Sequence, residues 1–326
     1  MKNGIKKNII IETDYQISLY KHWNLFDSLI FSYPILDSFP TFKKYDQKKI
    51  KKLFNLLGIP LEQAKQKYCF MKKEYKEIFK RKITEVCGEF GLKNLNFFSF
   101  VYQFDEKNQY TASDYVHCLS FMINYFEDNE AIISEDCHNF EEINNCQNIK
   151  KNMCQKKREY EKFWVCYNFL SFKSQKNIKK IIMLAIEFKK KIAQQSKIIL
   201  DDIKLHKNFY ISWVKENKEN KYLLNSSSIL ILALLVQYSY QKIQNELVQP
   251  KPFILVIQNE NEKSYTVASV IGNARESFIL KIPFYIIFRM AANKTDSQIK
   301  FSSFDKCIIE ISKNDFDVFN QEIIKD

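Results

Sequence analysis

The chain of 326 residues is basic, with 50 Lys and Arg against 38 Asp and Glu and a net charge of +12. Its hydrophobic content of 46% is enough for a folded core and excludes wholesale disorder, while five glycines and six prolines favour helices over a many-turned β-sandwich. The length allows about two domains. The charge points to an acidic partner, but almost all basic residues are lysines, which argues against a dedicated reader of DNA sequence.

The charge changes sign along the chain. Residues 1–100 and 150–221 are basic, residues 101–149 are acidic, and residues 222–326 are neutral. The longest apolar run, at 229–236, is far shorter than the ~20 residues that span a bilayer, and no signal peptide is expected at the N-terminus. Eight cysteines in such a chain are typical of reduced thiols inside the cell.

Residues 1–126 are expected to form a mainly helical region. Apolar side chains recur at helical spacing from Asp46, and Gly58 followed by Pro60 is typical of a helix end. A second, short helix is expected over 61–68. The pattern therefore predicts two helices joined by a tight turn.

A third helix is expected from Lys73, with Gly91 in the C-cap position. The aromatic residues at 97–104 lose the helical period, and either a short strand or an aromatic plug fits them. Thr111 and Asp114 have the spacing of a capping box, with Asp in place of the usual Glu. They predict a further helix that begins at this point.

Residues 127–158 are polar and charged and are interpreted as an acidic loop insertion. A long-helix region follows over 159–207. Residues 208–326 are interpreted as a strand, a helix, a β-hairpin across 259–262, a helix, a strand and a last helix. The predicted fold class is therefore α/β and rich in helix, with a helical region followed by a small mixed α/β lobe.

Several short motifs before residue 126 have an order and spacing that resemble one protein family closely. The residues that carry the resemblance are His22, Trp23, Asp27 and Ser28, the turn at Gly58 and Pro60, Gly91, and the helix start at Ser113 and Asp114. The family is that of the eukaryotic cell division control protein 45. The order of elements expected over 165–326 is also similar to that of the family.

The resemblance implies a non-catalytic subunit of the replicative DNA helicase in the nucleus. Family members bridge the minichromosome maintenance ring and the GINS complex during initiation and elongation, and they bind single-stranded DNA or chromatin. They descend from the DHH phosphoesterases, so the C-terminal lobe is expected to resemble the DHH-associated domain. The family's N-terminal, DHH-derived half is expected to lie outside this sequence. A truncated gene model, a split locus and a shortened paralogue then remain as alternatives, as does a stand-alone binder of single-stranded nucleic acid.

No catalytic, cofactor or metal site is expected, and no membrane partner. A working DHH phosphoesterase needs several Asp and His ligands for two metal ions, and none of the four histidines stands in an Asp-His-His run. Cysteines at 137, 146 and 154, with His138, lack the short paired spacing of zinc sites, so free thiols are the simpler interpretation.

Two lysine clusters are candidates for nucleic-acid binding. Their members are Lys43, Lys44 and Lys48 in the first and Lys189, Lys190 and Lys191 in the second. Either cluster can contact phosphates or serve as a nuclear import signal, but a solvated helix face is the simpler interpretation.

Two further features have a packing interpretation beside a functional one. His22 is expected to be a hydrogen-bonded packing residue and Trp23 a core anchor, although the two together can also form a functional pair. The aromatic residues at 97–104 can stack bases, but five aromatics so close together are more often part of a buried strand.

Overall fold

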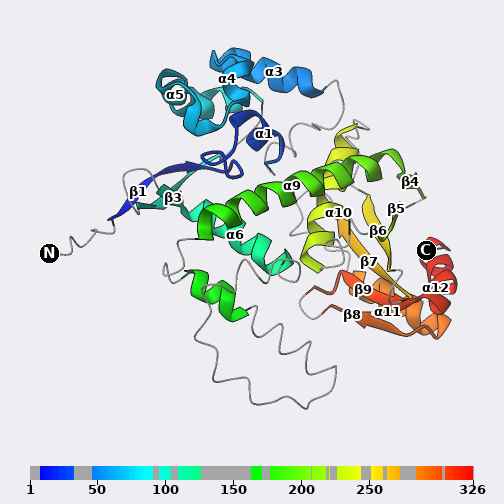
Figure 1. Ribbon diagram of the computed structural model, residues 1–326. Helices are drawn as coiled ribbons and strands as arrows, with labels where there is room; N and C mark the ends of the chain where they lie inside the picture. The colour runs from blue at the N-terminus through cyan, green and yellow to red at the C-terminus, as the bar shows by residue number, and fades with distance from the viewer. Residues whose placement is uncertain are drawn as a thin grey trace, which may run out of the picture. The chain divides into compact units, whose positions relative to one another are not determined.

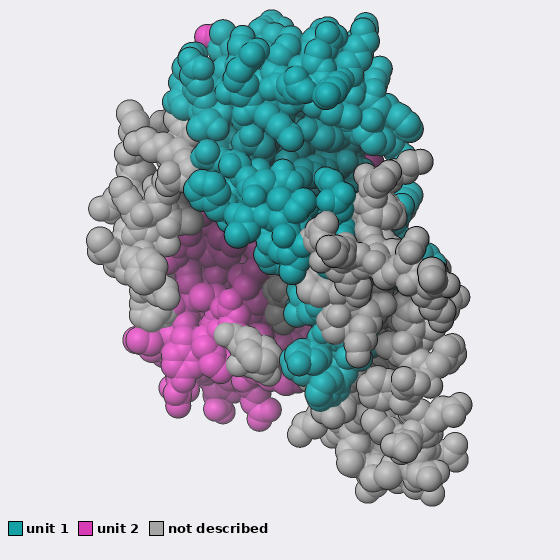
Figure 2. Space-filling model, turned by 90° about the vertical axis from the view of Figure 1, so that its left-hand side faces the viewer, with its two compact units in different colours: residues 1–32, 54–189 teal, residues 33–53, 190–326 magenta. Residues whose placement is uncertain are grey.

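The computed structural model shows a mixed α/β protein that divides into two compact units (Figures 1 and 2). The first unit comprises residues 1–32 with 54–189, and the second comprises residues 33–53 with 190–326. The structure describes residues 8–32, 46–90, 95–103, 109–125, 163–170, 177–206, 208–217, 220, 226–243, 251–259, 263–271, 284–302 and 305–325. The predicted acidic loop over 127–158 lies outside these residues, as do Lys43, Lys44 and Gly91.

The first unit contains a three-stranded antiparallel sheet in the order β1-β2-β3. Its strands are β1 (Asn8–Tyr15), β2 (Asn96–Gln103) and β3 (Gln109–Thr111). Ile11 pairs with Phe100, and Tyr102 pairs with Tyr110. Of the two interpretations left open for the aromatic residues at 97–104, the short strand is present as β2, but the sequence did not predict β1. The region before residue 126 is therefore less purely helical than expected.

The helix predicted from Asp46 is present as α3 (Asp46–Leu57), and it follows α1 (Leu25–Ile30). Gly58 adopts a φ of +72°, the left-handed conformation that glycine tolerates at a helix end, and Ile59 N donates to the Phe54 carbonyl. Pro60 then precedes α4 (Leu61–Lys65), which is shorter than the predicted helix over 61–68.

The helix predicted from Lys73 is present as α5 (Lys73–Glu89), which follows a 3-10 turn, η1 (Tyr68–Phe70). Its apolar stripe is buried, and Phe79 and Ile83 are completely inaccessible. The ring of Phe79 meets the ring of Tyr15 edge to face, with centroids 5.5 Å apart. Helix α5 therefore packs on the end of β1.

Helix α6 (Ala112–Tyr125) continues directly from β3 and packs on β2. The long predicted helix is present as α9 (Ile178–Asp201), which crosses the border between the two units. The rings of Phe121 and Phe188 lie 5.9 Å apart and connect α6 with the first half of α9.

The second unit is built on a six-stranded mixed sheet in the order β4-β5-β6-β7-β9-β8. Its strands are β4 (Lys204–Leu205), β5 (Tyr210–Lys215), β6 (Pro252–Asn259), β7 (Ser264–Ile271), β8 (Ile299–Phe301) and β9 (Ile308–Ser312). Only β5 and β6 run parallel, with α10 (Ser226–Ile243) as their crossover. The predicted hairpin is the antiparallel pair of β6 and β7.

Helices cover both faces of this sheet. On one face α10 packs on β6 and β7, and the rings of Tyr210 and Tyr240 lie 4.8 Å apart. On the other face α11 (Phe284–Thr295) and α12 (Lys313–Lys325) form a core with Ile254, Val256 and Ile309 (Figure 1). Asp315 N donates to Ser312 Oγ at 3.2 Å, so Ser312 caps the last helix.

Candidate functional site

The N-terminus of α6 is capped reciprocally by its own first turn, as the sequence predicted. Thr111 N donates to Asp114 Oδ2 at 2.8 Å, and Asp114 N donates to Thr111 Oγ1 at 3.2 Å. An aspartate in the first turn is also favoured by the helix dipole. The chain therefore places a carboxylate at this helix end for local reasons alone.

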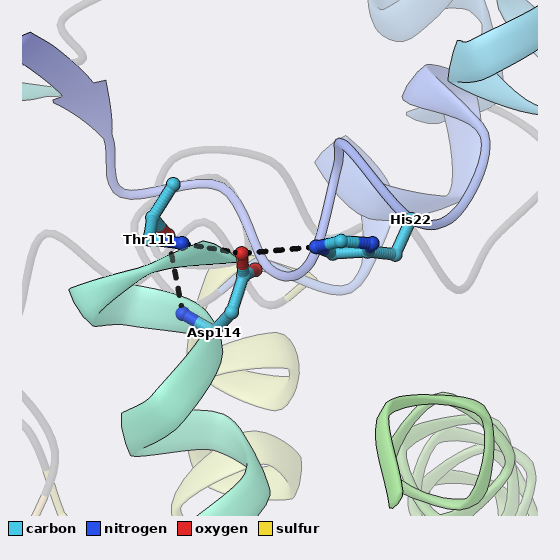
Figure 3. Close-up of polar contacts among 3 residues, drawn as sticks. All are labelled: His22, Thr111 and Asp114. Atoms are coloured by element: carbon cyan, nitrogen blue, oxygen red, sulfur yellow. Dashed lines mark hydrogen bonds and ion pairs between the residues drawn. The ribbon is translucent and has the colours of Figure 1, made fainter. Parts of the chain in front are cut away.

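His22 meets the same carboxylate from the loop that follows β1 (Figure 3). Its Nε2 lies 3.0 Å from Asp114 Oδ2, and its ring stacks on Tyr110 with centroids 5.6 Å apart. The His22 side chain is 20% exposed and that of Asp114 is 4% exposed. Two members of the sequence motif, 92 residues apart, are thus brought into direct contact.

The protonation of this pair follows from its surroundings. Burial alone would raise the pKa of the Asp114 carboxyl, but the charge of His22, its hydrogen bond and the Thr111 amide hold this pKa below its ordinary value. Asp114 is then ionised at neutral pH and can only accept hydrogen bonds. The proton of this contact therefore lies on Nε2 of His22.

Backbone hydrogen bonds and buried side chains hold the loop that carries His22. Leu19 is buried and adopts a φ of 51°, a conformation rare for leucine, and its carbonyl accepts hydrogen bonds from the amides of His22 and Trp23. The Trp23 carbonyl in turn accepts a hydrogen bond from Tyr68 N at 2.7 Å. The indole ring of Trp23 stacks on the ring of Phe31. Trp23 is 5% exposed, in agreement with the expected role as a core anchor.

The two remaining residues of this motif lie in the short helix that follows the loop. Asp27 N donates to Asn24 Oδ1 at 2.7 Å, and Asn24 Nδ2 donates to Asp27 Oδ2 at 2.8 Å, so the two residues cap α1 reciprocally. Ser28 is completely buried, and its carbonyl accepts a hydrogen bond from Ser32 Oγ. Asp27 therefore makes its contact at the start of α1, and Ser28 makes its contact just beyond the end of this helix.

The other motif residues are placed separately. Gly58 and Pro60 form the turn between α3 and α4, and α4 packs on α1. Ser113 lies in the first turn of α6, beside Asp114, and is half-buried. Gly91 lies outside the described residues. The structure thus joins His22 to Asp114 directly, whereas the Gly58–Pro60 turn supports the loop through α4 and α1.

The candidate lysines differ in their surroundings. Lys48 is exposed on α3, and Lys190 and Lys191 are exposed on α9. Lys189 is half-buried, and burial lowers the pKa of its ammonium group to about 8. Lys189 is therefore less suited to phosphate binding than its two neighbours. Lys43 and Lys44 lie outside the described residues.

The aromatic residues at 97–104 were interpreted as part of a buried strand, and β2 is buried only in part. Val101 and Tyr102 are buried, but Phe98 is 85% exposed and Phe100 is 39% exposed. Helix α6 packs on β2 and β3. On the side of Phe98 and Phe100, the buried residues Tyr102 and Tyr110 lie towards β3. The sequence pattern could not show which part of a strand lacks a covering element.

Three residues of this neighbourhood were not singled out from the sequence. Tyr110 carries the stacked ring of His22, and the charge of Lys21 helps to lower the pKa of Asp114. Asp14 is 2% exposed near the end of β1, and burial raises the pKa of its carboxyl. Since each acts through a contact distant in the sequence, no local pattern marks it.

The hydrogen bonds of this site hold the loop after β1 against the first turn of α6. The acceptor oxygen Oδ2 of Asp114 is used twice, by His22 and by the Thr111 amide, and the Thr111 hydroxyl is used by Asp114 N. Within the described ranges, no group of three or more His, Cys, Asp or Glu side chains is arranged to hold a metal ion. Among the helices that the structure describes, none is long and apolar enough to cross a membrane.

The chain is similar to known proteins over nearly its whole length. A sequence profile of the CDC45 family matches residues 2–325. The chain is 28% identical to the Cell division control protein 45 homolog of Dictyostelium discoideum over 317 residues, which are 97% of this chain and 45% of that protein. It is 22% identical to Cell division control protein 45 of Saccharomyces cerevisiae over 332 residues, which are 96% of this chain and 50% of that protein.

The fold is similar to that of a solved CDC45 structure. The crystal structure of CDC45 from Entamoeba histolytica superposes with a TM-score of 0.67 at 20% identity and covers 98% of this chain and 58% of that chain. The chain thus spans about half the length of the curated relatives that match it from end to end. Because the family profile covers almost every residue, the chain belongs to the CDC45 family.

Proposed function

We propose that this chain acts in DNA replication as a non-catalytic scaffold within the eukaryotic replicative helicase. In this role it works in the nucleus and connects the minichromosome maintenance ring with the GINS complex. The observation that carries the proposal is the family match over residues 2–325, which includes the motif around His22. Because the chain spans about half of its relatives, the partners are proposed for the assembled protein rather than for this part alone.

The chemistry of the motif supports a scaffold rather than an enzyme. The one histidine–aspartate pair among the described residues has its carboxylate committed to capping α6. Of the other motif residues that the structure describes, Asp27 caps α1, Gly58 and Pro60 form the turn before α4, and Trp23 and Ser28 are buried. Residues that hold loops in fixed positions are what a protein needs when its surface, rather than a reactive group, carries the function.

Affinity purification from nuclei tests the proposal directly. The endogenous protein carries a tag at its C-terminus, and the nuclear extract is treated with nuclease so that DNA cannot connect the proteins indirectly. We expect subunits of the minichromosome maintenance ring and of GINS in the eluate, identified by mass spectrometry, and none from untagged cells. An eluate that lacks both complexes would contradict the proposal.

A second candidate function is direct binding of single-stranded DNA, which the exposure of Lys190 and Lys191 on α9 favours. Neutralised phosphates release counterions, so the affinity should fall with salt and reversal of two charges should reduce that slope. The double variant K190E/K191E is compared with K72E/K73E, two exposed lysines at the start of α5. An equal effect of both variants, or an affinity independent of salt, would argue against a specific role of α9.

A further inference from the structure

One face of the three-stranded sheet exposes large apolar side chains in a contiguous group. Ile9 is 64% exposed, Ile11 is 77%, Phe98 is 85% and Phe100 is 39%. Ile11 pairs directly with Phe100 across the two strands, and Ile9 and Phe98 lie two residues further along on the same face. These four residues are called the apolar face below.

The opposite face of the same sheet is covered by α6 over part of its area. Val101 is 1% exposed beneath α6, whereas its partner on β1, Ile10, is 43% exposed near the start of that strand. Thr111 on the same side is 2% exposed.

On the side of the apolar face, Tyr102 and Tyr110 are each 3% exposed, so this side is covered towards β3. The exposure of Phe98 and Phe100 is therefore confined to one part of an otherwise folded sheet.

The apolar face is unusual for a surface that stays in contact with water. Contiguous exposed apolar groups on folded proteins generally mark an interaction site. Strand β1 is also an edge strand in the described structure, since it pairs with β2 alone, and an apolar edge strand invites pairing with another polypeptide. Both features indicate that another polypeptide covers this region.

The composition of the apolar face favours a protein over a nucleic acid. On this side Ile9 pairs with Tyr102 and Phe98 pairs with Thr13, so the cross-strand partners of the apolar face include no lysine or arginine. Stacking platforms for single strands combine aromatic side chains with a basic groove that follows the phosphates. Here the aromatic side chains have aliphatic neighbours, which suits a partner with an apolar surface of its own.

We propose that the apolar face is the docking surface for the half of the CDC45 fold that this chain does not match. The match covers 45% of the Dictyostelium discoideum relative and 50% of the Saccharomyces cerevisiae relative, so about as much polypeptide again lies outside it. An interface that is never exposed in the assembled protein has a more apolar composition than a transient one. The face can receive that half from the same polypeptide or from a separate one.

Site-specific crosslinking in the native cells tests this inference without reference to the helicase. The photoreactive residue p-benzoylphenylalanine replaces Phe98 in one version of the protein and Val116, which is 62% exposed on α6, in the control version. After irradiation, crosslinked peptides are identified by mass spectrometry. We expect position 98 to crosslink to sequence similar to the unmatched half of the relatives, and position 116 not to do so.

Every other result at position 98 overturns the inference. Crosslinks to a second copy of this chain would assign the face to self-association, and crosslinks to another protein would assign it to that partner. The absence of crosslinks would show that the face is solvent-exposed. Since neither the minichromosome maintenance ring nor GINS enters this readout, its failure is distinct from failure of the proposed function.

A second measurement uses variants that keep the fold. The exposed positions permit I11S/F98S, and V116S/I123S removes two exposed apolar residues from α6 as a matched control. When residues 1–326 are measured alone, both variants should unfold at the midpoint of the unmodified chain, because all four side chains are solvent-exposed in it. We expect I11S/F98S to reduce the yield of the crosslink from a photoreactive residue at Phe100 at least tenfold and V116S/I123S to leave it unchanged. Equal yields from the two variants would overturn the inference.

Discussion

The imidazole of His22 and the carboxylate of Asp114 lie 3.0 Å apart, although 92 residues separate them in the chain. The pair connects the loop after β1 to the first turn of α6, and these are two of the segments by which the sequence resembles its family. Because Asp114 is 3% exposed, loss of its charge cannot be compensated by water. The contact therefore links the family motif to the stability of the fold.

Asp114→Asn should destabilise the protein by about 1.5–3 kcal/mol, the range for a hydrogen bond to a charged group. Chemical denaturation at pH 7 measures this change. Asp317→Asn on the exposed side of α12 is the control and should change the free energy of unfolding by less than about 0.5 kcal/mol.

A double-mutant cycle separates the contact itself from the cap of α6. His22→Gln and Asp114→Asn, alone and combined, should show a coupling free energy of about 1–2 kcal/mol. Additive effects would mean that Asp114 stabilises the protein only through Thr111, and that His22 contributes by packing alone.

Acid should destabilise the protein in two ranges of pH. Burial and the nearby charge of Lys189 lower the pKa of His117 to about 3. As the pH falls below about 6.5, this histidine becomes protonated in the unfolded chain but not in the folded chain, so the free energy of unfolding decreases. The lowered pKa of Asp114 adds stability above about pH 4 that is lost as the pH falls further. Both effects have the same sign, so stability declines continuously towards acid.

His117→Gln tests the first of these ranges. The stability of the unmodified protein should decline by up to about 1.4 kcal/mol per pH unit from this histidine alone between pH 6 and 4. The variant should show a smaller decline over the same interval, measured by urea denaturation at several pH values. Parallel curves for the two proteins would show that His117 does not contribute.

Phe79→Ala should cost about 3–5 kcal/mol, because the side chain is fully buried against Tyr15 and Tyr20 and its removal leaves a cavity. Phe70→Ala is the matched control, since that ring is 74% exposed. Thermal unfolding of both variants checks the prediction. Similar midpoints would mean that the buried stripe of α5 contributes little to stability.

The features predicted from the sequence are those with local causes. The cap of Thr111 and Asp114 is a four-residue pattern, and the end of α3 depends on Gly58 and Pro60 in direct succession. The hairpin of β6 and β7 joins strands that are neighbours in the chain. In each case the residues that fix the structure lie within a few positions of one another.

The features that were missed depend on distant partners. Strand β1 contains a short apolar run, and its partner in the sheet is β2. Because β1 ends at Tyr15 and β2 begins at Asn96, no local pattern in the sequence shows that the two strands pair. The contact of His22 with Asp114 is of the same kind. The exposure of Phe98 depends on which elements cover the sheet, and an aromatic residue in a strand does not carry that information.

Lys189 is an intermediate case, because a signal was present in the sequence. It lies four residues after Ala185 and three before Ile192, at the helical spacing that places a side chain near the apolar stripe of α9. Its grouping with Lys190 and Lys191 as a basic cluster obscured this position. The structure separates it from its neighbours by burial.

Lys189→Met should stabilise the protein by about 1–2 kcal/mol at pH 7, because it replaces a half-buried ammonium group with an apolar side chain of similar length. The lowered pKa of about 8 means that the folded chain bears the full cost of the charge below pH 8. As the pH rises from 8 to about 10.4 the folded chain releases the proton before the unfolded chain does, so the advantage of the variant should shrink. Lys197→Met, at an exposed position of the same helix, should change the stability by less than about 0.5 kcal/mol at every pH. If Lys189→Met were the more destabilising of the two, the Lys189 ammonium group would have to make a favourable contact that outweighs the cost of its burial.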